Sequence, residues 1–284
     1  MGCNKDNTLN NYEITTPKYI ILGLLLFPIT IYAQSNMSKD STEYIFSKSP
    51  AFSIFKDNYF ISGTTLNETP SKDNSDAKFQ FSFKQRLQNK PLVCGAYFYL
   101  TYTQKSFWDI YKSSSPFAES NYNPGLQLIK PIYKKDRYIG VFGVSIEHES
   151  NGRDSINSRS WNFVGIHYSH FFSDKVLASI KVFIPFGLSD NPDLNKYIGY
   201  SEAQFTWNIK KDRLILDVTG RKGAEWDTKG SLMTTLSARP SVKRNLYWSI
   251  QWWQGYSESL IDYKQSTSMI RIGLTVKPTF FRFN

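Results

Sequence analysis

The chain of 284 residues is basic and aromatic, with a formal net charge of +10 and 16% Phe, Trp and Tyr, yet its mean hydropathy is negative. This combination argues against a soluble α/β protein and favours a β-protein with one apolar and one polar face. The basic residues are scattered along the chain, which argues against nucleic-acid binding, and the two cysteines, Cys3 and Cys94, make no disulfide framework.

The first predicted element is an export signal. Segment 18–35, KYIILGLLLFPITIYAQS, has a basic residue, an apolar run and a small-residue site, so we expect a signal peptide over residues 1–33. A membrane anchor is the alternative, but the apolar run contains Pro28 and is shorter than the ~20 residues that a spanning helix needs. The polar residues 34–56 are expected to form a loosely ordered periplasmic arm.

Residues 57–284 read as one domain in which apolar and polar side chains alternate. In one segment, for example, Phe205 and Trp207 alternate with Gln204 and Thr206, which is the strand pattern of a sheet with one wet face. Twelve segments have this pattern: 58–66, 78–88, 94–104, 122–132, 138–150, 160–172, 176–186, 196–209, 213–220, 230–238, 244–254 and 267–278. Short connections (NKPLV, KKDR, SDK, KKD) alternate with longer ones such as KSFWDIYKSSSPFAES and NGRDSINSR.

An even number of ~10-residue strands with connections of alternating length is typical of outer-membrane proteins. The sequence therefore predicts an all-β fold, a twelve-stranded antiparallel transmembrane β-barrel with short periplasmic turns and longer extracellular loops. Aromatic residues near strand ends, such as Trp248 and Trp252, fit interfacial girdles. A secreted soluble β-sandwich is the alternative.

The stretch EHESNGRDSINSRSWN, residues 147–162, is the strongest candidate site. Alternation places His148 and Ser150 on one strand face, which is expected to point outward to lipid. That face is expected to carry Tyr138, Phe142, Val144 and Ile146. Asn162, in the next strand, also points outward and is brought beside His148 by the hairpin. Polar groups on such a face are costly and are therefore candidates for function.

The spacing suits nucleophilic catalysis. Ser150 could attack a carbonyl carbon, His148 could take its proton and Asn162 could orient the imidazole. Gly152 would let backbone N–H groups turn toward an oxyanion. The loop residues Asp154, Ser155, Asn157 and Ser158 offer oxygen atoms that suit Ca²⁺ better than zinc. On spacing alone, a polar hairpin tip without catalytic function stays the alternative, and His167 and His170 are expected to be structural.

Several long blocks of the sequence resemble the outer membrane phospholipase A family, with a dense match from about Asn58 to Ile272. These blocks are YTQKSFWDIY (102–111), SSPFAESNYNP (114–124), HESNGR (148–153), SRSWN (158–162), DNPDLNKYIGY (190–200) and YSESLIDY (256–263). The resemblance implies a membrane-embedded twelve-stranded barrel of the bacterial outer membrane. It also implies hydrolysis of acyl esters of glycerophospholipids, with A1, A2 and lysophospholipase activities.

The resemblance also implies roles for individual residues. Ser150 matches the nucleophile, His148 the general base and Asn162 the orienting residue. The family is activated by Ca²⁺ and by homodimerisation, with calcium held near the oxyanion at the subunit interface. Arg153, through its backbone carbonyl, and Ser158 match calcium ligands of one subunit.

Two further positions match residues of the dimer. Ser114 matches a calcium ligand from the partner subunit, and Gln104 matches a polar residue that pairs across the dimer within the apolar interface. Two departures from the family stand in the hairpin. Glu149 replaces an Asp, with little effect expected because it points inward, and Asp154 lies one position before the family's acidic residue, where Ser155 aligns. The second departure leaves undecided whether the chain has a second calcium site.

Two other classes of function compete with the phospholipase. A catalytically inert outer-membrane barrel, acting as a channel or a structural protein, would have lost one member of the trio, and none is lost. A soluble secreted esterase would lack the alternating apolar band.

Overall fold

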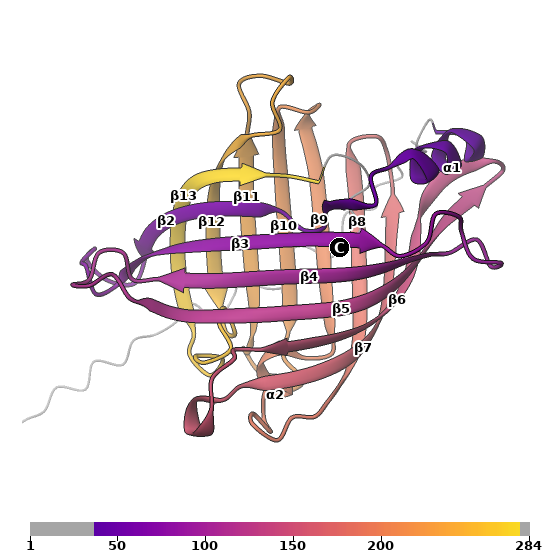
Figure 1. The fold of residues 1–284 in the computed structure, drawn as a ribbon. Coiled ribbons are helices and arrows are strands. Elements are labelled where there is room, and N and C mark those ends of the chain that lie inside the picture. The colour runs from indigo at the N-terminus through magenta and orange to yellow at the C-terminus, as the bar shows by residue number, and fades with distance from the viewer. Residues whose placement is uncertain (1–36, 279–284) are drawn as a thin grey trace, which may run out of the picture. The chain divides into compact units, whose positions relative to one another are not determined.

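The computed structural model describes residues 37–278, and twelve of its strands form a closed antiparallel barrel (Figure 1). The strands are β2 Asn58–Thr65, β3 Ser75–Arg86, β4 Tyr97–Trp108, β5 Phe117–Lys134, β6 Arg137–Ser150, β7 Ser160–Phe171, β8 Val176–Phe186, β9 Ser201–Lys210, β10 Leu214–Lys222, β11 Gly230–Ala238, β12 Tyr247–Gly255 and β13 Thr267–Val276. Each strand pairs with its neighbours in the sequence, and β13 closes the barrel by pairing with β2. The predicted fold class is confirmed.

The barrel wall separates an apolar exterior from a polar interior. In β6, Phe142, Val144 and Ile146 are exposed, whereas the intervening Ser145 and Glu147 are buried. Alternation along a strand produces this division because successive side chains point to opposite faces. Neither helix within residues 37–278 is long and apolar enough to cross a membrane.

Tyr138 departs from the predicted alternation. We expected it on the outward face, but it is buried against Val141 and Tyr97. The β5–β6 register shifts between Ile132 and Tyr133. Such a bulge adds one unpaired residue, which reverses the side-chain direction beyond it.

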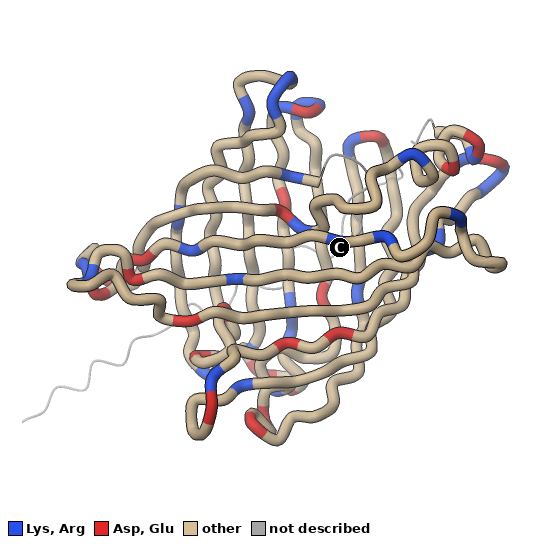
Figure 2. The backbone as a smooth tube through the Cα atoms, in the orientation of Figure 1, with Lys and Arg blue, Asp and Glu red and all other residues tan. Residues whose placement is uncertain are grey.

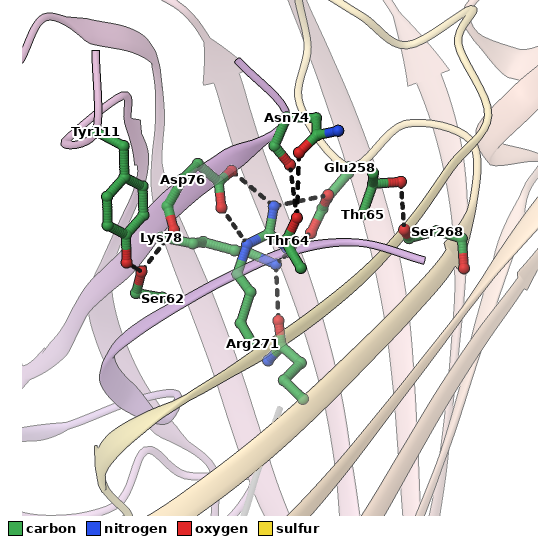
Figure 3. Close-up of polar contacts among 11 residues, drawn as sticks. Ser62, Thr64, Thr65, Asn74, Asp76, Lys78, Tyr111, Glu258, Ser268 and Arg271 are labelled. Atoms are coloured by element: carbon green, nitrogen blue, oxygen red, sulfur yellow. Dashed lines mark hydrogen bonds and ion pairs between the residues drawn. The ribbon is translucent and has the colours of Figure 1, made fainter. Parts of the chain in front are cut away.

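Charged pairs fill the interior of the barrel. Arg271 of β13 contacts Asp76 at 2.6 Å and Glu258 at 2.7 Å, and Lys78 of β3 contacts the same Glu258 at 2.9 Å (Figure 3). Buried charges are stable only when they are paired and hydrogen-bonded. These contacts join β3, β13 and the connection after β12. An interior cavity of ≈ 200 Å³ borders Lys78.

The segment before the barrel is ordered, which corrects the expected loose arm over residues 34–56 in its described part. It forms α1, Lys39–Lys48, and β1, Phe52–Ile54, which pairs with β3. Ser38 caps the helix by accepting a hydrogen bond from the Ser41 N–H, and Phe46 packs against the ring of Tyr97. A short amphipathic segment becomes ordered here because tertiary packing covers its apolar side. Its periplasmic location stays a prediction, and the expected signal peptide lies outside the described residues.

The two ends of the barrel differ. We call the end with the connections after β3, β5, β7, β9 and β11 the turn end, and the opposite end the loop end. The loop end carries a 3-10 turn, Ser155–Asn157, and a short helix, α2, Asn195–Ile198, where we had expected the start of a strand. Strands β4 and β5 run further toward this end than expected, so the loop that we placed at 105–120 spans only residues 109–116.

Candidate active site

His148 and Asn162 lie directly opposite each other in β6 and β7. The imidazole Nδ1 is 2.9 Å from the Asn162 Oδ1. Because an amide oxygen only accepts hydrogen bonds, Nδ1 donates, and Nε2 is left with the lone pair that a general base needs. The predicted neighbourhood of these two side chains is confirmed.

Ser150 follows on the same outward face of β6, at the end of the strand. Two strand residues advance the backbone by about 6.6–6.8 Å, close enough for their side chains to approach each other. Ser150 pairs with Tyr122 of β5 on one side and with Ser160 of β7 on the other. Ser150, His148 and Asn162 are all half-buried. The three therefore share the outward face at the loop end, bordered below by the exposed Ile146 and Val164.

Pro124 changes the backbone bonding beside His148. The β5–β6 register, which pairs Tyr122 with Ser150 and Gly125 with Glu147, places Pro124 opposite His148. Proline has no N–H to donate, and the side-chain amide of Asn123 donates to the His148 carbonyl instead, at 2.8 Å. This bond secures the strand at the position of the base. The sequence signal was the Asn-Pro pair, which we had read only as part of the resemblance.

Contacts inside the barrel hold the same strand from behind. The Trp161 indole Nε1 donates to Glu149 Oε2 at 3.1 Å, and Lys181 of β8 donates to Glu147 Oε1 at 2.7 Å. Trp161 is buried in an aromatic cluster and lies 4.3 Å from Phe163 between ring centroids. Glu149 points inward as expected, and it borders the interior cavity.

Gly187 makes room for the side chain of Asn162. It has φ +66°, and a Cβ built on it would lie 2.7 Å from the Asn162 amide nitrogen. Asn162 pairs with Phe186, the residue before this glycine. Glycine therefore serves two purposes here, a left-handed backbone and space for the orienting amide. Its isolated position in the sequence gave no signal of this role.

The connection 151–159 is organised by the buried Asn151. Its amide donates to the Asn157 carbonyl at 2.8 Å, and its Oδ1 accepts from the N–H groups of Arg153 and Arg159 at 3.3 and 3.0 Å. These bonds bring the two ends of the loop together. Gly152 has φ +66°, a left-handed backbone that glycine adopts without strain, and its role toward an oxyanion stays a prediction.

An acidic residue that sequence reasoning missed lies beside the expected calcium ligands. The Ser158 hydroxyl donates to Asp190 Oδ2 at 2.6 Å, and the Ser160 hydroxyl donates to the same oxygen at 3.1 Å. These hydrogen bonds lower the pKa of Asp190. Hydroxyl and carboxylate oxygens together suit a hard cation, although the described residues contain no cluster of three His, Cys, Asp or Glu side chains that could hold a metal.

Ser114 lies in the connection between β4 and β5, with φ 64°. Two contacts fix this connection. Trp108 Nε1 donates to the Ser115 carbonyl at 2.8 Å, and the Tyr111 hydroxyl lies 2.7 Å from Ser62 Oγ (Figure 3). No hydrogen bond joins Ser114 to Arg153 or Ser158 within the described part of the chain.

Gln104 lies on the outer face of β4, opposite Phe81 of β3 and Tyr122 of β5. Its Oε1 accepts from the Tyr102 hydroxyl at 3.1 Å, and its Nε2 donates to Ser106 Oγ at 3.2 Å. Tyr122 in turn pairs with Ser150, so Gln104 and Ser150 lie in one row across three neighbouring strands. Their backbones are therefore about 10 Å apart.

The other two histidines lie away from this trio. His167 is inside the barrel, with its Nε2 2.7 Å from Ser145 Oγ, and His170 lies toward the other end of β7, with its Nδ1 3.2 Å from the Tyr168 hydroxyl. Their positions agree with the expected structural role.

Residues 36–276 match a family described as Phospholipase A1. The phospholipase A1 of Escherichia coli K12 is 31% identical over 222 residues, which cover 75% of this chain and 73% of that protein. The solved structure of outer membrane phospholipase A from Escherichia coli superposes with a TM-score of 0.72 at 27% identity and covers 81% of this chain and 100% of that chain. A Salmonella typhi outer membrane phospholipase dimer with bound calcium has a TM-score of 0.72 at 26% identity and covers 82% of this chain and 95% of that chain.

Proposed function

The chain belongs to the phospholipase A1 family of outer-membrane ester hydrolases, and we propose that it hydrolyses acyl ester bonds of glycerophospholipids with a Ser150–His148–Asn162 trio. The observation that carries this assignment is the 2.9 Å contact between His148 Nδ1 and Asn162 Oδ1. It leaves Nε2 as the base on the face that carries Ser150. We propose A1 and A2 activities on glycerophospholipids and lysophospholipase activity on the products.

The reaction follows from this arrangement. His148 Nε2 takes the proton of the Ser150 hydroxyl as its oxygen attacks the ester carbonyl, and Asn162 holds the imidazole in the required tautomer and direction. The imidazolium then returns the proton to the departing lysophospholipid oxygen. Water, activated by the same base, releases the fatty acid from Ser150. Asn162 is neutral, so it orients the imidazolium more than it stabilises the charge.

Calcium is the proposed cofactor. The Arg153 carbonyl and the Ser158 hydroxyl would hold it on one subunit, with Asp190 beside Ser158 at 2.6 Å, and Ser114 would come from the partner subunit. Bound calcium supplies positive charge that stabilises an oxyanion. The chain's own contribution is the loop that Asn151 ties together, which keeps these oxygen atoms close to the end of β6.

Dimerisation through the outer face of β3, β4 and β5 is the proposed activating step. Gln104 satisfies its amide within its own strand, and these bonds would be exchanged for a bond across the interface with the partner's amide. The neighbouring outward side chains Phe81 and Leu100 are exposed and would form the apolar wall of an acyl-chain cleft. Substrate would reach the trio sideways from the outer leaflet.

The test is hydrolysis of phospholipid by the protein refolded in detergent, with calcium or with a chelator. Ser150→Ala and His148→Ala are expected to lower kcat by about 10³-fold or more, and the chelator by about 10²-fold, the scale of a lost oxyanion donor. His170→Ala, a histidine at the other end of β7, is the matched control and should keep the parent rate. Full activity of Ser150→Ala would refute the nucleophile, and an inactive parent would favour the inert barrel.

A further inference from the structure

The two ends of the barrel carry opposite net charge. At the turn end, residues 87–96, 134–137, 172–175, 210–213 and 239–246 contain eleven basic and three acidic residues, a net charge of +8 (eleven minus three). At the loop end, residues 66–74, 109–116, 151–159, 187–200, 223–229 and 256–266 contain seven basic and ten acidic residues, a net charge of −3 (seven minus ten). Helix α1 at the turn end has two residues of each sign. Most of the net charge of the protein is therefore concentrated at one end.

Ion pairing accentuates this difference. At the loop end, Lys112, Lys196 and Lys264 each lie within 3.2 Å of a carboxylate oxygen. Among the eleven basic residues of the five turn-end connections, all of them described, only Arg239 has a carboxylate within 4.0 Å, that of Asp212 at 3.9 Å. The other ten basic residues of the turn end are exposed: Lys90, Lys134, Lys135, Arg137, Lys175, Lys210, Lys211, Arg213, Lys243 and Arg244. These ten and Arg239 form what we call the basic ring.

The basic ring surrounds the barrel instead of forming a patch on one side. Its residues come from all five connections of the turn end, as the Lys and Arg positions in Figure 2 show. The outer wall next to it carries exposed aromatic side chains, among them Tyr168, Phe172, Trp207 and Trp248. Aromatic side chains with adjacent basic residues are typical of the level where lipid headgroups meet water. A single protein partner would contact one side of such a ring, whereas a lipid leaflet contacts all of it.

We propose that the basic ring binds the headgroups of anionic phospholipids in the periplasmic leaflet. Unpaired ammonium and guanidinium groups at this level attract phosphate, and the attraction adds over residues that face the same surface. The acidic, internally paired loop end offers no such surface, so the ring also favours one orientation of the barrel in the membrane. The inference does not depend on the catalytic trio.

Tryptophan fluorescence provides the test. Trp207 precedes Lys210 in β9, and Trp248 pairs with Ala238, the residue before Arg239. Both tryptophans face outward, so brominated lipids at the ring quench them. A Ser150→Ala protein, which cannot consume its lipid, is refolded into phosphatidylcholine vesicles that contain brominated phosphatidylglycerol or, separately, brominated phosphatidylcholine. We expect about fivefold selectivity for phosphatidylglycerol at low salt, the value for one basic residue per headgroup, and a decrease with added salt.

Two variants that each lose four positive charges test which end of the barrel carries the lipid selectivity. One replaces four lysines of the ring by glutamine (Lys134, Lys135, Lys210 and Lys211), and the other replaces four lysines of the loop end (Lys72, Lys112, Lys196 and Lys264). We expect selectivity to fall in the first variant, which keeps seven of the eleven ring residues, and to stay at the parent value in the second, with both migrating as folded barrels in gels. Equal quenching by the two lipids in the parent, or the same loss in both variants, would overturn the proposal.

Discussion

Gly187→Ala is a sharp test of the active-site geometry because it changes no proposed catalytic group. The new Cβ would lie 2.7 Å from the Asn162 amide nitrogen, and ordinary contact begins at 3.4 Å. The amide must therefore move by about 0.7 Å. If that movement lengthens the 2.9 Å bond to His148, the bond falls outside hydrogen-bonding range. The side chain that orients the base is then misplaced.

The expected cost separates into two parts. A left-handed alanine costs about 1 kcal/mol or slightly more in folding free energy. A misplacement approaching 1 Å in a catalytic constellation costs up to about 10²-fold in rate, so we expect kcat to fall roughly 10- to 100-fold. Gly95→Ala is the matched control, since Gly95 also has positive φ, +76°, and no atom lies within 4 Å of its Cβ position. It should show the folding cost and the parent kcat.

The assay combines phospholipid hydrolysis at saturating calcium with urea titration of the folded band in gels. A double-mutant cycle then traces the effect to Asn162. In an Asn162→Ala background, which removes the amide, Gly187→Ala should lower kcat no further. The reasoning is refuted if Gly187→Ala keeps kcat within about twofold of the Gly95→Ala value, or if its effect persists without the Asn162 amide.

Three further substitutions test the support of the site. Asn151→Ala removes the amide that ties the 151–159 loop and should weaken calcium binding about tenfold by calorimetry; unchanged affinity would contradict its role. Tyr111→Phe removes the contact with Ser62, worth about 0.5–1.5 kcal/mol, and should raise the calcium needed for cross-linked dimers severalfold, whereas an unchanged requirement would separate that loop from dimerisation. Glu147→Gln removes the carboxylate that lies 2.7 Å from the half-buried Lys181 and should lower the free energy of unfolding by about 3 kcal/mol; a change below about 0.5 kcal/mol in urea titration would show that solvent already screens the pair.

The fold was largely predictable because a membrane barrel obeys one local rule. Each strand alternates apolar and polar side chains, so all twelve strands were found from sequence. The failures came where distant residues decide the outcome. Tyr138 turns inward because of a bulge in the β5–β6 pairing. The segment 39–54 is ordered because Phe46 packs against barrel residues and Arg86 donates hydrogen bonds to the carbonyls of Ser47 and Ser49.

Local alternation also made the core of the candidate site predictable, whereas the contacts that depend on distant connections were missed. Strand parity and one hairpin are enough to bring His148 beside Asn162, and both are local. Asp190 and Gly187 come from the connection after β8, and their contacts with Ser158 and Asn162 depend on how that connection folds over β7. Alternation carries no information about such contacts. Resemblance had supplied the block around residue 190 without assigning it a role.

Glu149 shows how a contact on the inner face of the barrel wall supports the residues on the outer face. Glu149 stands between His148 and Ser150, and it faces the interior, where its carboxylate accepts a hydrogen bond from Trp161. Trp161 is directly opposite Glu149 and immediately precedes Asn162. One inner contact therefore holds both strands that carry the outer trio. The longer Glu in place of the family's Asp should be tolerated as long as this contact is made, since the base is positioned through the backbone and not by the carboxylate itself.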